Sequence, residues 1–600
     1  MLLNLVLFPI FTFFFYSIGN IIYIILEKNY FFFFKKKNAI KSYFFEKLLY
    51  SIFFLGFLAV IFNFFSPLDS LIFRTTIIII LLVSFLFIKK LDFQIFINNI
   101  FLILILSLLP GVMVPGYDAA LYHIPYQSWI KNYELLLGFS SLNFRFALGS
   151  FYNYISAILW IENSFLFVSY FSTLFYLIFF LFLKEFLSEN FKKIIFSLLI
   201  LFTLPLWTRY IFPSFSLVDA PFGILSIIFL SLFFFKLKIW TENGILRNEI
   251  FLLIVILSLL IGIKLTGIFF IPLIIYLILF NVIKRKKNNF LILPSLILII
   301  FLCLWFLRSF IISGCFVYPL NFSCFNVAWF DAEVLKYTVN EIGLYTFKPF
   351  KLAILNFKIT KFLILSFLIT IILLYAIFNY IKFNLNKFSK FNYIYISILL
   401  LCYIALIIRI EDLRGFSVLV ESQKHSEIRY IILSEIFNIV SFFFLSFLFV
   451  FLVEKKNILK FNKNILLSNY SYIFYYLIFL LLIWGIKAPH PRFAYGYIPL
   501  IVPMLFILLF DLKEIKTTFL SKNYNKIILI FVLFFTLNEI KFKNFNIYDF
   551  KILNDIKVEK RLGFGTKPLF QNLCWNSKDC YIGSDKKISD KNIFFRKIID

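Results

Sequence analysis

The sequence predicts an all-α integral membrane protein, a polytopic bundle of transmembrane helices, from its composition, its apolar runs and the placement of its lysines. Apolar residues make up 62% of the 600 residues and charged residues only 15%, whereas soluble domains average about half apolar and about a quarter charged. Uncharged stretches such as 77–88 and 252–263 are typical of spanning helices, because backbone groups in lipid can hydrogen-bond only to one another.

The apolar runs fit about 16 spans, with about 14 as the lower bound. The first run lacks the preceding basic residues and the small-residue cleavage site of a signal peptide, so we expect it to be retained. The predicted spans are 3–26, 43–66, 71–88, 94–110, 165–183, 193–208, 216–235, 249–263, 267–283, 290–307, 360–381, 393–409, 430–453, 469–486, 497–511 and 526–540.

The net charge of +28 is divided unequally between the connections. Alternate connections all carry lysine or arginine clusters, and the positive-inside rule places them in the cytoplasm. This pattern explains the charge without a nucleic-acid partner. The less basic connections, predicted to be extracytoplasmic, are 111–147, 308–358, 410–428, 487–496 and the tail 541–600. We therefore expect a transmembrane domain over 1–540, an extracytoplasmic C-terminal tail over 541–600, and both termini outside.

One apolar segment, 148–160, is too short to span comfortably. We predict an interfacial or re-entrant helix there, because a span would invert every later connection.

Four cysteines lie in the extracytoplasmic connections, where disulfides persist. Cys315 and Cys324 flank a turn-like stretch, and Cys574 and Cys580 lie six residues apart in the tail. We expect these two pairings, although spacing alone does not prove them.

The loop after the fourth predicted span carries the strongest candidate site. Asp118 follows a Pro-Gly turn, and a helix starting there would align it with Leu121 and Tyr122 on one face. A helix N-terminus stabilises a carboxylate, but aspartate is also a common N-cap. His123 and Arg145 lie in the same loop; packing is the alternative role for His123. No cluster has metal-ligand spacing, so no metal site is predicted, although a divalent cation would be compatible with the loop.

Charged residues also lie near the outer ends of predicted spans. They are Asp219, Lys264, Arg308 and Glu435. Charge at membrane depth is costly and usually functional, although Lys264 and Arg308 are long enough to snorkel toward water. Arg492 lies in a Pro-His-Pro-Arg turn between two spans. Its planar guanidinium suits a phosphate, and a lipid-headgroup anchor is the alternative.

These motifs resemble an uncharacterised bacterial family of multi-span membrane proteins. That family is in turn similar to the C-type glycosyltransferases, the superfamily of protein mannosyltransferases and lipid A aminoarabinose transferases. In the superfamily the acidic loop usually follows the first span rather than the fourth. The residues that carry the resemblance are Gly116, Asp118, Leu121, Tyr122, His123, Pro125, Trp129, Gly138, Leu142, Arg145, Arg308, Ser309, Ser313, Gly314, Pro489, Pro491, Arg492, Phe493, Cys574, Trp575 and Cys580.

The resemblance implies transfer of a sugar from a polyprenyl-phosphate carrier to a glycan, lipid or protein acceptor outside the cytoplasm. It places the chain among membrane lipids in the bacterial inner membrane, in cell-envelope glycan or lipid modification. Asp118 is the expected catalytic residue. The expected substrate-binding residues are Tyr122, His123, Arg145, Asp219, Lys264, Arg308 and Arg492.

Two other functional classes remain open at this point: a transporter or flippase for a lipid-linked saccharide, and a non-catalytic membrane assembly protein. The sequence has neither an internal repeat nor a Walker or Gly-x-Gly-x-x-Gly phosphate loop, which counts against transport and nucleotide use by this chain.

Overall fold

The structure, a computed structural model, describes most of the first 340 residues and several later segments. Most of the described residues are helical, and the strands form three two-stranded pairs. The described residues are 2–31, 43–115, 119–161, 164–203, 214–215, 218–284, 289–340, 459–461, 469–487, 496–512, 519–542, 588–593 and 596–599.

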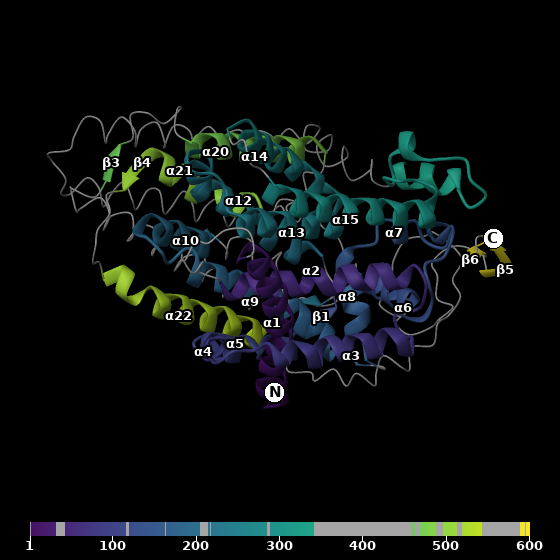
Figure 1. The fold of residues 1–600 in the computed structure, drawn as a ribbon, viewed down its shortest axis with the longest axis horizontal. Coiled ribbons are helices and arrows are strands. Elements are labelled where there is room, and N and C mark those ends of the chain that lie inside the picture. Colours follow the sequence, from purple (N-terminus) through teal and green to yellow (C-terminus); the bar gives the residue numbers. More distant parts are fainter. Residues whose placement is uncertain are drawn as a thin grey trace, which may run out of the picture.

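The elements follow the chain as labelled in Figure 1. Up to residue 203 they are α1 (Leu2–Phe31), α2 (Phe44–Asn63), α3 (Leu71–Leu86), α4 (Lys90–Ile97), α5 (Ile100–Leu106), η1 (Leu109–Gly111), β1 (Val114–Pro115), η2 (Ala119–His123), α6 (Ile124–Asn132), η3 (Phe139–Ser141), α7 (Phe144–Ala147), α8 (Phe151–Leu159), α9 (Leu166–Glu185) and α10 (Phe191–Thr203). The later ones are β2 (Ser214–Phe215), α12 (Asp219–Asn243), α13 (Arg247–Ile263), η4 (Leu265–Phe270), α14 (Ile271–Lys284), α15 (Asn289–Ser313), η5 (Asn321–Ser323), β3 (Leu459–Phe461), α20 (Asn469–Lys487), α21 (Ile498–Leu509), β4 (Phe510–Leu512), α22 (Phe519–Phe542), β5 (Ile588–Ile593) and β6 (Arg596–Ile599).

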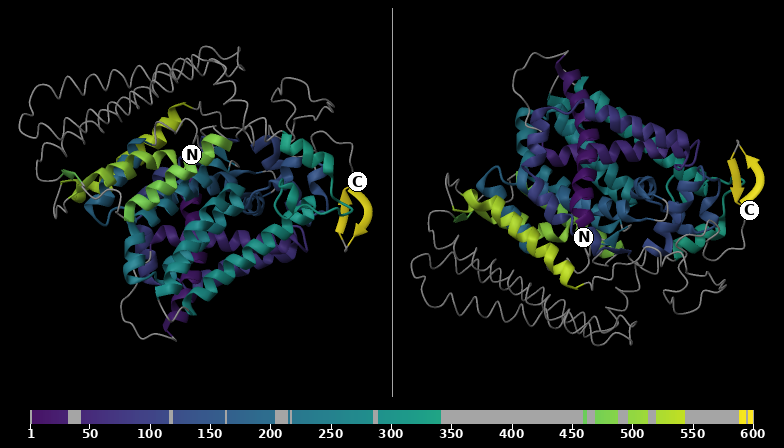
Figure 2. Two further views of the ribbon diagram at one scale, coloured as in Figure 1. Left: turned by 90° about the horizontal axis from the view of Figure 1, so that it is seen from above. Right: turned by 90° about the horizontal axis from the view of Figure 1, so that it is seen from below.

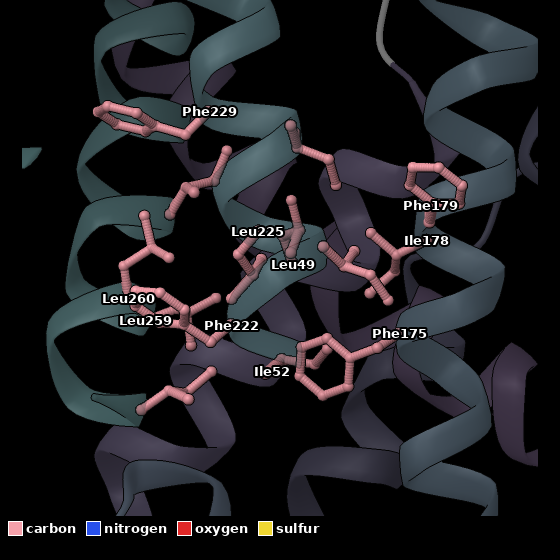
Figure 3. Close-up of a cluster of buried hydrophobic side chains, with 14 of the residues drawn as sticks. Leu49, Ile52, Phe175, Ile178, Phe179, Phe222, Leu225, Phe229, Leu259 and Leu260 are labelled. Atoms are coloured by element: carbon pink, nitrogen blue, oxygen red, sulfur yellow. The ribbon is translucent and has the colours of Figure 1, made fainter. Parts of the chain in front are cut away.

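Helices α2, α9, α12 and α13 form the centre of the bundle. They are apolar on every face because each is surrounded by other helices: 89% of the apolar window of α9 is buried, and 83% of that of α12. Figure 3 shows how side chains from all four helices meet in the core. Among them are Leu49, Ile52, Phe175, Ile178, Phe222, Leu225, Leu259 and Leu260.

The outer helices expose apolar side chains instead. Only 28% of the apolar window of α15 is buried, and α3 exposes Leu82 and Leu86. Contiguous apolar surface on this scale is costly in water and is covered by lipid in a membrane protein. Among the described helices, five are long and apolar enough to cross a membrane, or six if α3 and α4 count as one bent span. The structure therefore supports the predicted all-α membrane bundle.

The predicted spans 360–381, 393–409 and 430–453 lie outside the described residues, and each of the others overlaps a described helix. The span predicted over 94–110 is wrong. Helix α4 ends at Ile97, α5 begins at Ile100, and α4 is bent by 101° from α3. Lys184 contacts the chain at this break: its Nζ donates to the backbone oxygen of Asn98 at 3.0 Å and to Asn99 Oδ1 at 2.7 Å.

The short segment predicted at 148–160 contains α8, and seven of its nine residues, 151–157, are buried. An interfacial helix would keep one face toward lipid headgroups, so this part of the expectation is wrong. Nine residues span only about 14 Å. Helix α8 is therefore a short buried helix, packed between α2, α6 and α9.

Contacts between the connecting segments show which of these segments lie together at each end of the bundle. At the end that we call the basic end, the backbone nitrogen of Phe44 donates to Glu185 Oε2 at 2.7 Å. Lys184 binds the α4–α5 break there, and Lys236 Nζ lies 3.0 Å from Glu249 Oε1. These contacts join connections that the charge pattern assigns to the cytoplasm.

At the other end, which we call the site end, Asn63 Nδ2 donates to the backbone oxygen of Tyr133 at 2.9 Å. The backbone nitrogen of Gly138 donates to the oxygen of Ile311 at 3.1 Å, and strand β6 near the C-terminus contacts η3. Figure 1 shows α6, α7 and the C-terminal strands together at the right, and Figure 2 shows the same grouping from above and below. The structure thus groups the connections as the charge pattern does.

Candidate functional site

Six of the predicted catalytic and substrate-binding residues are described. They are Tyr122, His123, Arg145, Asp219, Lys264 and Arg308. Asp118 and Arg492 lie outside the described residues, as do Glu435, Cys574 and Cys580.

The helix expected at Asp118 begins at Ala119, and its first turn is a π-helix, Ala119–His123. Helix α6 follows, with Pro125 in its first turn. A proline cannot donate to the carbonyl four residues earlier, and its ring clashes with that carbonyl in an α-helix. The wider π-turn avoids this clash with Leu121. Asp118 itself lies outside the described residues, so its alignment with Leu121 and Tyr122 stays a prediction. Single π-turns occur often at functional sites.

Arg308 lies at the centre of a buried polar cluster at the site end. The residue is 1% exposed. It donates from Nε to the Tyr154 hydroxyl at 2.9 Å and from Nη2 to the Tyr126 hydroxyl. The two hydroxyls lie 3.3 Å apart, and the guanidinium covers the ring of Trp305 with 4.5 Å between its carbon and the ring centroid. We call Tyr126, Tyr154 and Arg308 the Arg308 cluster.

The charge of Arg308 has no carboxylate partner among the described residues. Burial raises the pKa of the Tyr126 hydroxyl well above its usual range, although the adjacent guanidinium acts in the opposite direction. Tyr126 is therefore neutral and does not balance the charge. Lys47 at the basic end gives the contrast, because its buried ammonium has Asp92 Oδ1 at 2.9 Å. A buried cation without a counter-ion is costly unless an anion binds nearby.

Gly149 is required for the seating of Arg308. A β-carbon there would lie 2.5 Å from Arg308 Nη2, 2.8 Å from Tyr126 Cζ and 2.9 Å from the backbone oxygen of Phe146. We expect Gly149→Ala to displace the guanidinium and to lower the free energy of unfolding by about 1–3 kcal/mol, as overpacking does. Thermal unfolding in detergent measures this change.

Gly111→Ala is the matched control for Gly149→Ala. Its β-carbon would have Asn4 Nδ2 as its nearest neighbour, at 3.4 Å, so the melting temperature should change little. Equal melting temperatures for the two variants would contradict the close packing on Arg308.

A second set of buried polar groups, on α6 and α8, adjoins the Arg308 cluster. Gln127 Nε2 donates to Asn153 Oδ1 at 3.3 Å, and Asn153 Nδ2 lies 3.3 Å from His123 Nδ1. Gln127 follows Tyr126 on α6 and Asn153 precedes Tyr154 on α8, so these two helices carry residues of both sets, while His123 ends η2 and Arg308 lies on α15. His123 is thus a buried residue with a polar contact.

Arg145 and Tyr122 extend this region toward the partly exposed surface. The Arg145 guanidinium lies over the rings of Phe144 and Tyr122, with 4.4 and 5.7 Å between its carbon and their centroids. The Tyr122 ring in turn lies 4.2 Å from the His123 ring, centroid to centroid. The structure therefore brings together the three residues predicted from the acidic loop.

Asp219 and Lys264, predicted separately, form an ion pair between the start of α12 and the end of α13. The position of Asp219 in the first turn of α12 also stabilises its carboxylate. The pairing means that Lys264 brings less free positive charge than the sequence suggested. Strands β1 and β2 pair in parallel, with Pro115 opposite Phe215. Pro115 lies shortly before Asp118 in the chain and Phe215 shortly before Asp219, so this pairing joins the segments that precede the two acidic residues.

The Asp219–Lys264 ion pair and the Arg308 cluster lie on helices that pack against each other, because Lys264 is the C-cap residue of α13 and Tyr154 lies on α8. A β-carbon on Gly262 of α13 would lie 2.8 Å from Cβ of Phe151, the first residue of α8. Lys264 is two residues beyond Gly262, and Gly149 is two residues before Phe151. Gly496, the first described residue after the segment that contains Arg492, packs against Ser226 of α12. These contacts join α13 to α8 and the start of the 496–512 segment to α12.

A disulfide joins Cys315 to Cys324 just beyond α15, the helix that carries Arg308. Within the described part of the chain, no group of three or more His, Cys, Asp or Glu side chains could hold a metal ion.

Sequence reasoning missed Tyr126, Gln127, Asn153 and Tyr154. One signal was available. His123, Tyr126 and Gln127 follow helical spacing, and Asn153 is an amide inside a short apolar segment, where an unpaired polar group would be costly. Their partners could not be identified without the packing of α6, α8 and α15.

A family model described as a domain of unknown function, DUF8201, matches residues 1–419, which include every described residue of the candidate site. No curated protein and no solved structure matches the chain. Since the family model covers more than two thirds of the 600 residues, the chain belongs to the family defined by the domain of unknown function DUF8201.

Proposed function

We propose that this protein is a C-type glycosyltransferase of about 16 spans in the bacterial inner membrane. It moves a sugar from a polyprenyl-phosphate carrier to a glycan, lipid or protein acceptor outside the cytoplasm. The site end faces outward in this proposal, because the connections at the opposite end are the lysine-rich ones.

The observation that carries the proposal is the buried guanidinium of Arg308, which has no carboxylate partner in the described residues. A protein that keeps such a charge at the end of a membrane bundle gains from it when an anion binds. The phosphate of a membrane-borne donor is an anion that reaches the outer helix ends from within the bilayer. The surrounding tyrosines and Trp305 exclude water and so strengthen the attraction.

The proposed chemistry assigns separate roles to the candidate residues. The acceptor hydroxyl oxygen attacks the anomeric carbon, and its proton passes to the carboxylate of Asp118. The bond between the anomeric carbon and the phosphate oxygen breaks, and the phosphate leaves with both electrons. Arg308 and Arg492 offset the charge that develops there. The Asp219–Lys264 pair and Arg145 bind the substrates.

The experiment that tests this function is a transfer assay. Membranes containing the full chain are incubated with a radiolabelled polyprenyl-phosphate hexose and a cell-envelope extract as acceptor pool. We expect label to move from the lipid-soluble fraction into the acceptor. Movement of labelled lipid between leaflets without transfer would identify a flippase instead.

The proposed orientation predicts the reactivity of the cysteines. In a Cys303→Ala, Cys402→Ala background, we expect a membrane-impermeant maleimide added from outside to label Cys574 and Cys580 only after reduction. The reason is that an oxidising compartment keeps the tail thiols paired. Cys315 and Cys324, already joined in the structure, should behave alike. Labelling exclusively from the cytoplasmic side would reverse the orientation.

A further inference from the structure

Asn153 and Gln127 form a buried relay that ends on the ring of His123, and its direction is fixed by the groups at its ends. All three residues are buried, with Gln127 and Asn153 fully enclosed. Gln127 Nε2 donates to Asn153 Oδ1, and Asn153 Nδ2 points at His123 Nδ1, both at 3.3 Å. An amide nitrogen carries hydrogens and no lone pair for accepting. His123 Nδ1 must therefore accept.

The opposite direction would be more costly. In that direction the nitrogen and oxygen of both side-chain amides would exchange places. His123 Nδ1 would donate to Asn153 Oδ1, and the amide hydrogens of Gln127 would lie where Gln127 Oε1 lies now. That position has no hydrogen-bond partner in the described part of the chain. A buried carbonyl oxygen that is under-satisfied is tolerated better than an orphaned buried N–H. The observed direction leaves the oxygen there.

The contact with Asn153 favours the neutral state of the ring. An imidazolium would lose the ability to accept at Nδ1.

We propose that Asn153 and Gln127 are positioning residues that hold His123 as a neutral imidazole with its proton on Nε2. His123 is then a hydrogen-bond donor through Nε2, so Asp118 is left as the proton acceptor of this loop. The tautomer rests on the geometry alone. The use of the Nε2 hydrogen on a substrate oxygen rests on the proposed function.

The tautomer can be observed directly, because the chain contains only three histidines. We would record nitrogen NMR spectra of the full chain in lipid nanodiscs with ¹⁵N-labelled histidine, and assign the His123 signals by their loss in His123→Gln. We expect an unprotonated Nδ1 and a protonated Nε2. A protonated Nδ1 in the wild-type protein, in either the other tautomer or the imidazolium, would overturn the proposal.

Two changes at Asn153 test whether the relay is the cause. Asn153→Asp replaces the donor with a carboxylate, which accepts but does not donate when ionised, so Nδ1 should become protonated. Asn153→Leu removes the relay and should give a mixture of tautomers. Asn99→Asp is the matched control, a buried asparagine at the basic end whose oxygen accepts from Lys184, and it should leave the His123 signals unchanged.

The outcomes separate this inference from the proposed function. An unchanged tautomer in both Asn153 variants would reject the relay, whatever the transfer assay gives. The expected spectra in a protein without transfer activity would retain the relay and reject the role on a sugar substrate.

Discussion

Asp118→Asn is expected to lower the rate of sugar transfer by about 100- to 10,000-fold, the usual loss when a general base is removed. Asparagine has nearly the same shape as aspartate but cannot take the proton of the acceptor hydroxyl. The protein should still reach the membrane and unfold at the wild-type temperature. Transfer of radiolabelled sugar, normalised to the amount of full-length protein, measures the effect.

Asp69→Asn is the matched control, because Asp69 is a carboxylate at the site end that pairs with Arg74 on the partly exposed surface. Its loss should leave transfer unchanged, since exposed ion pairs contribute little. A flippase or an assembly protein needs no base, so full activity in Asp118→Asn would remove the catalytic assignment.

Arg308→Leu carries the second largest expected effect. Removing the guanidinium should lower transfer by about 100- to 1,000-fold, as the loss of a preorganised electrostatic contact does. The melting temperature should stay the same or rise, because an apolar side chain replaces a buried charge that has no carboxylate partner in the described part of the chain. The two tyrosine hydroxyls, 3.3 Å apart, keep each other as partners. Loss of activity with retained stability is therefore the signature of a functional cation.

Two further variants make the Arg308 result specific. Arg308→Lys keeps the charge but not the two-pronged contact, so it should retain part of the activity. Arg74→Leu removes an equal charge from a partly exposed ion pair at the same end. It should change neither the rate of transfer nor the melting temperature. If Arg308→Leu lowers the free energy of unfolding by several kcal/mol, as the loss of one partner of a buried ion pair does, Arg308 is a structural residue.

Much of the helical pattern could be predicted because it depends on local composition. The limits of α2 and α9 agree with the predicted spans to within a few residues, since uncharged apolar runs have no other stable form in lipid. The prediction over 94–110 fails where a side chain from a distant helix contacts the backbone. Lys184 of α9 donates to the oxygen of Asn98, and no periodicity in 94–110 reveals a partner so far away in the chain.

The partners of buried charges could not be predicted from the sequence either. Lys47 and Asp92 look like ordinary charges beside cytoplasmic connections, yet they form a buried pair at 2.9 Å with Tyr16 bonded to both. Asp219 and Lys264 were predicted as independent site residues and are ion-paired. Residue type and spacing give the cost of a buried charge but not its partner.

The sequence by itself determined that the chain is a helical membrane protein and which connections share an end, because hydrophobic length and lysine placement are properties of each segment alone. Only the tertiary structure decided that Arg308 is buried with no carboxylate partner among the described residues and that Asn153 contacts His123. Both depend on the packing of α6, α8 and α15, where Gly149 leaves room for the guanidinium. Such contacts arise from the three-dimensional fit of helices far apart in the chain, which no local pattern encodes.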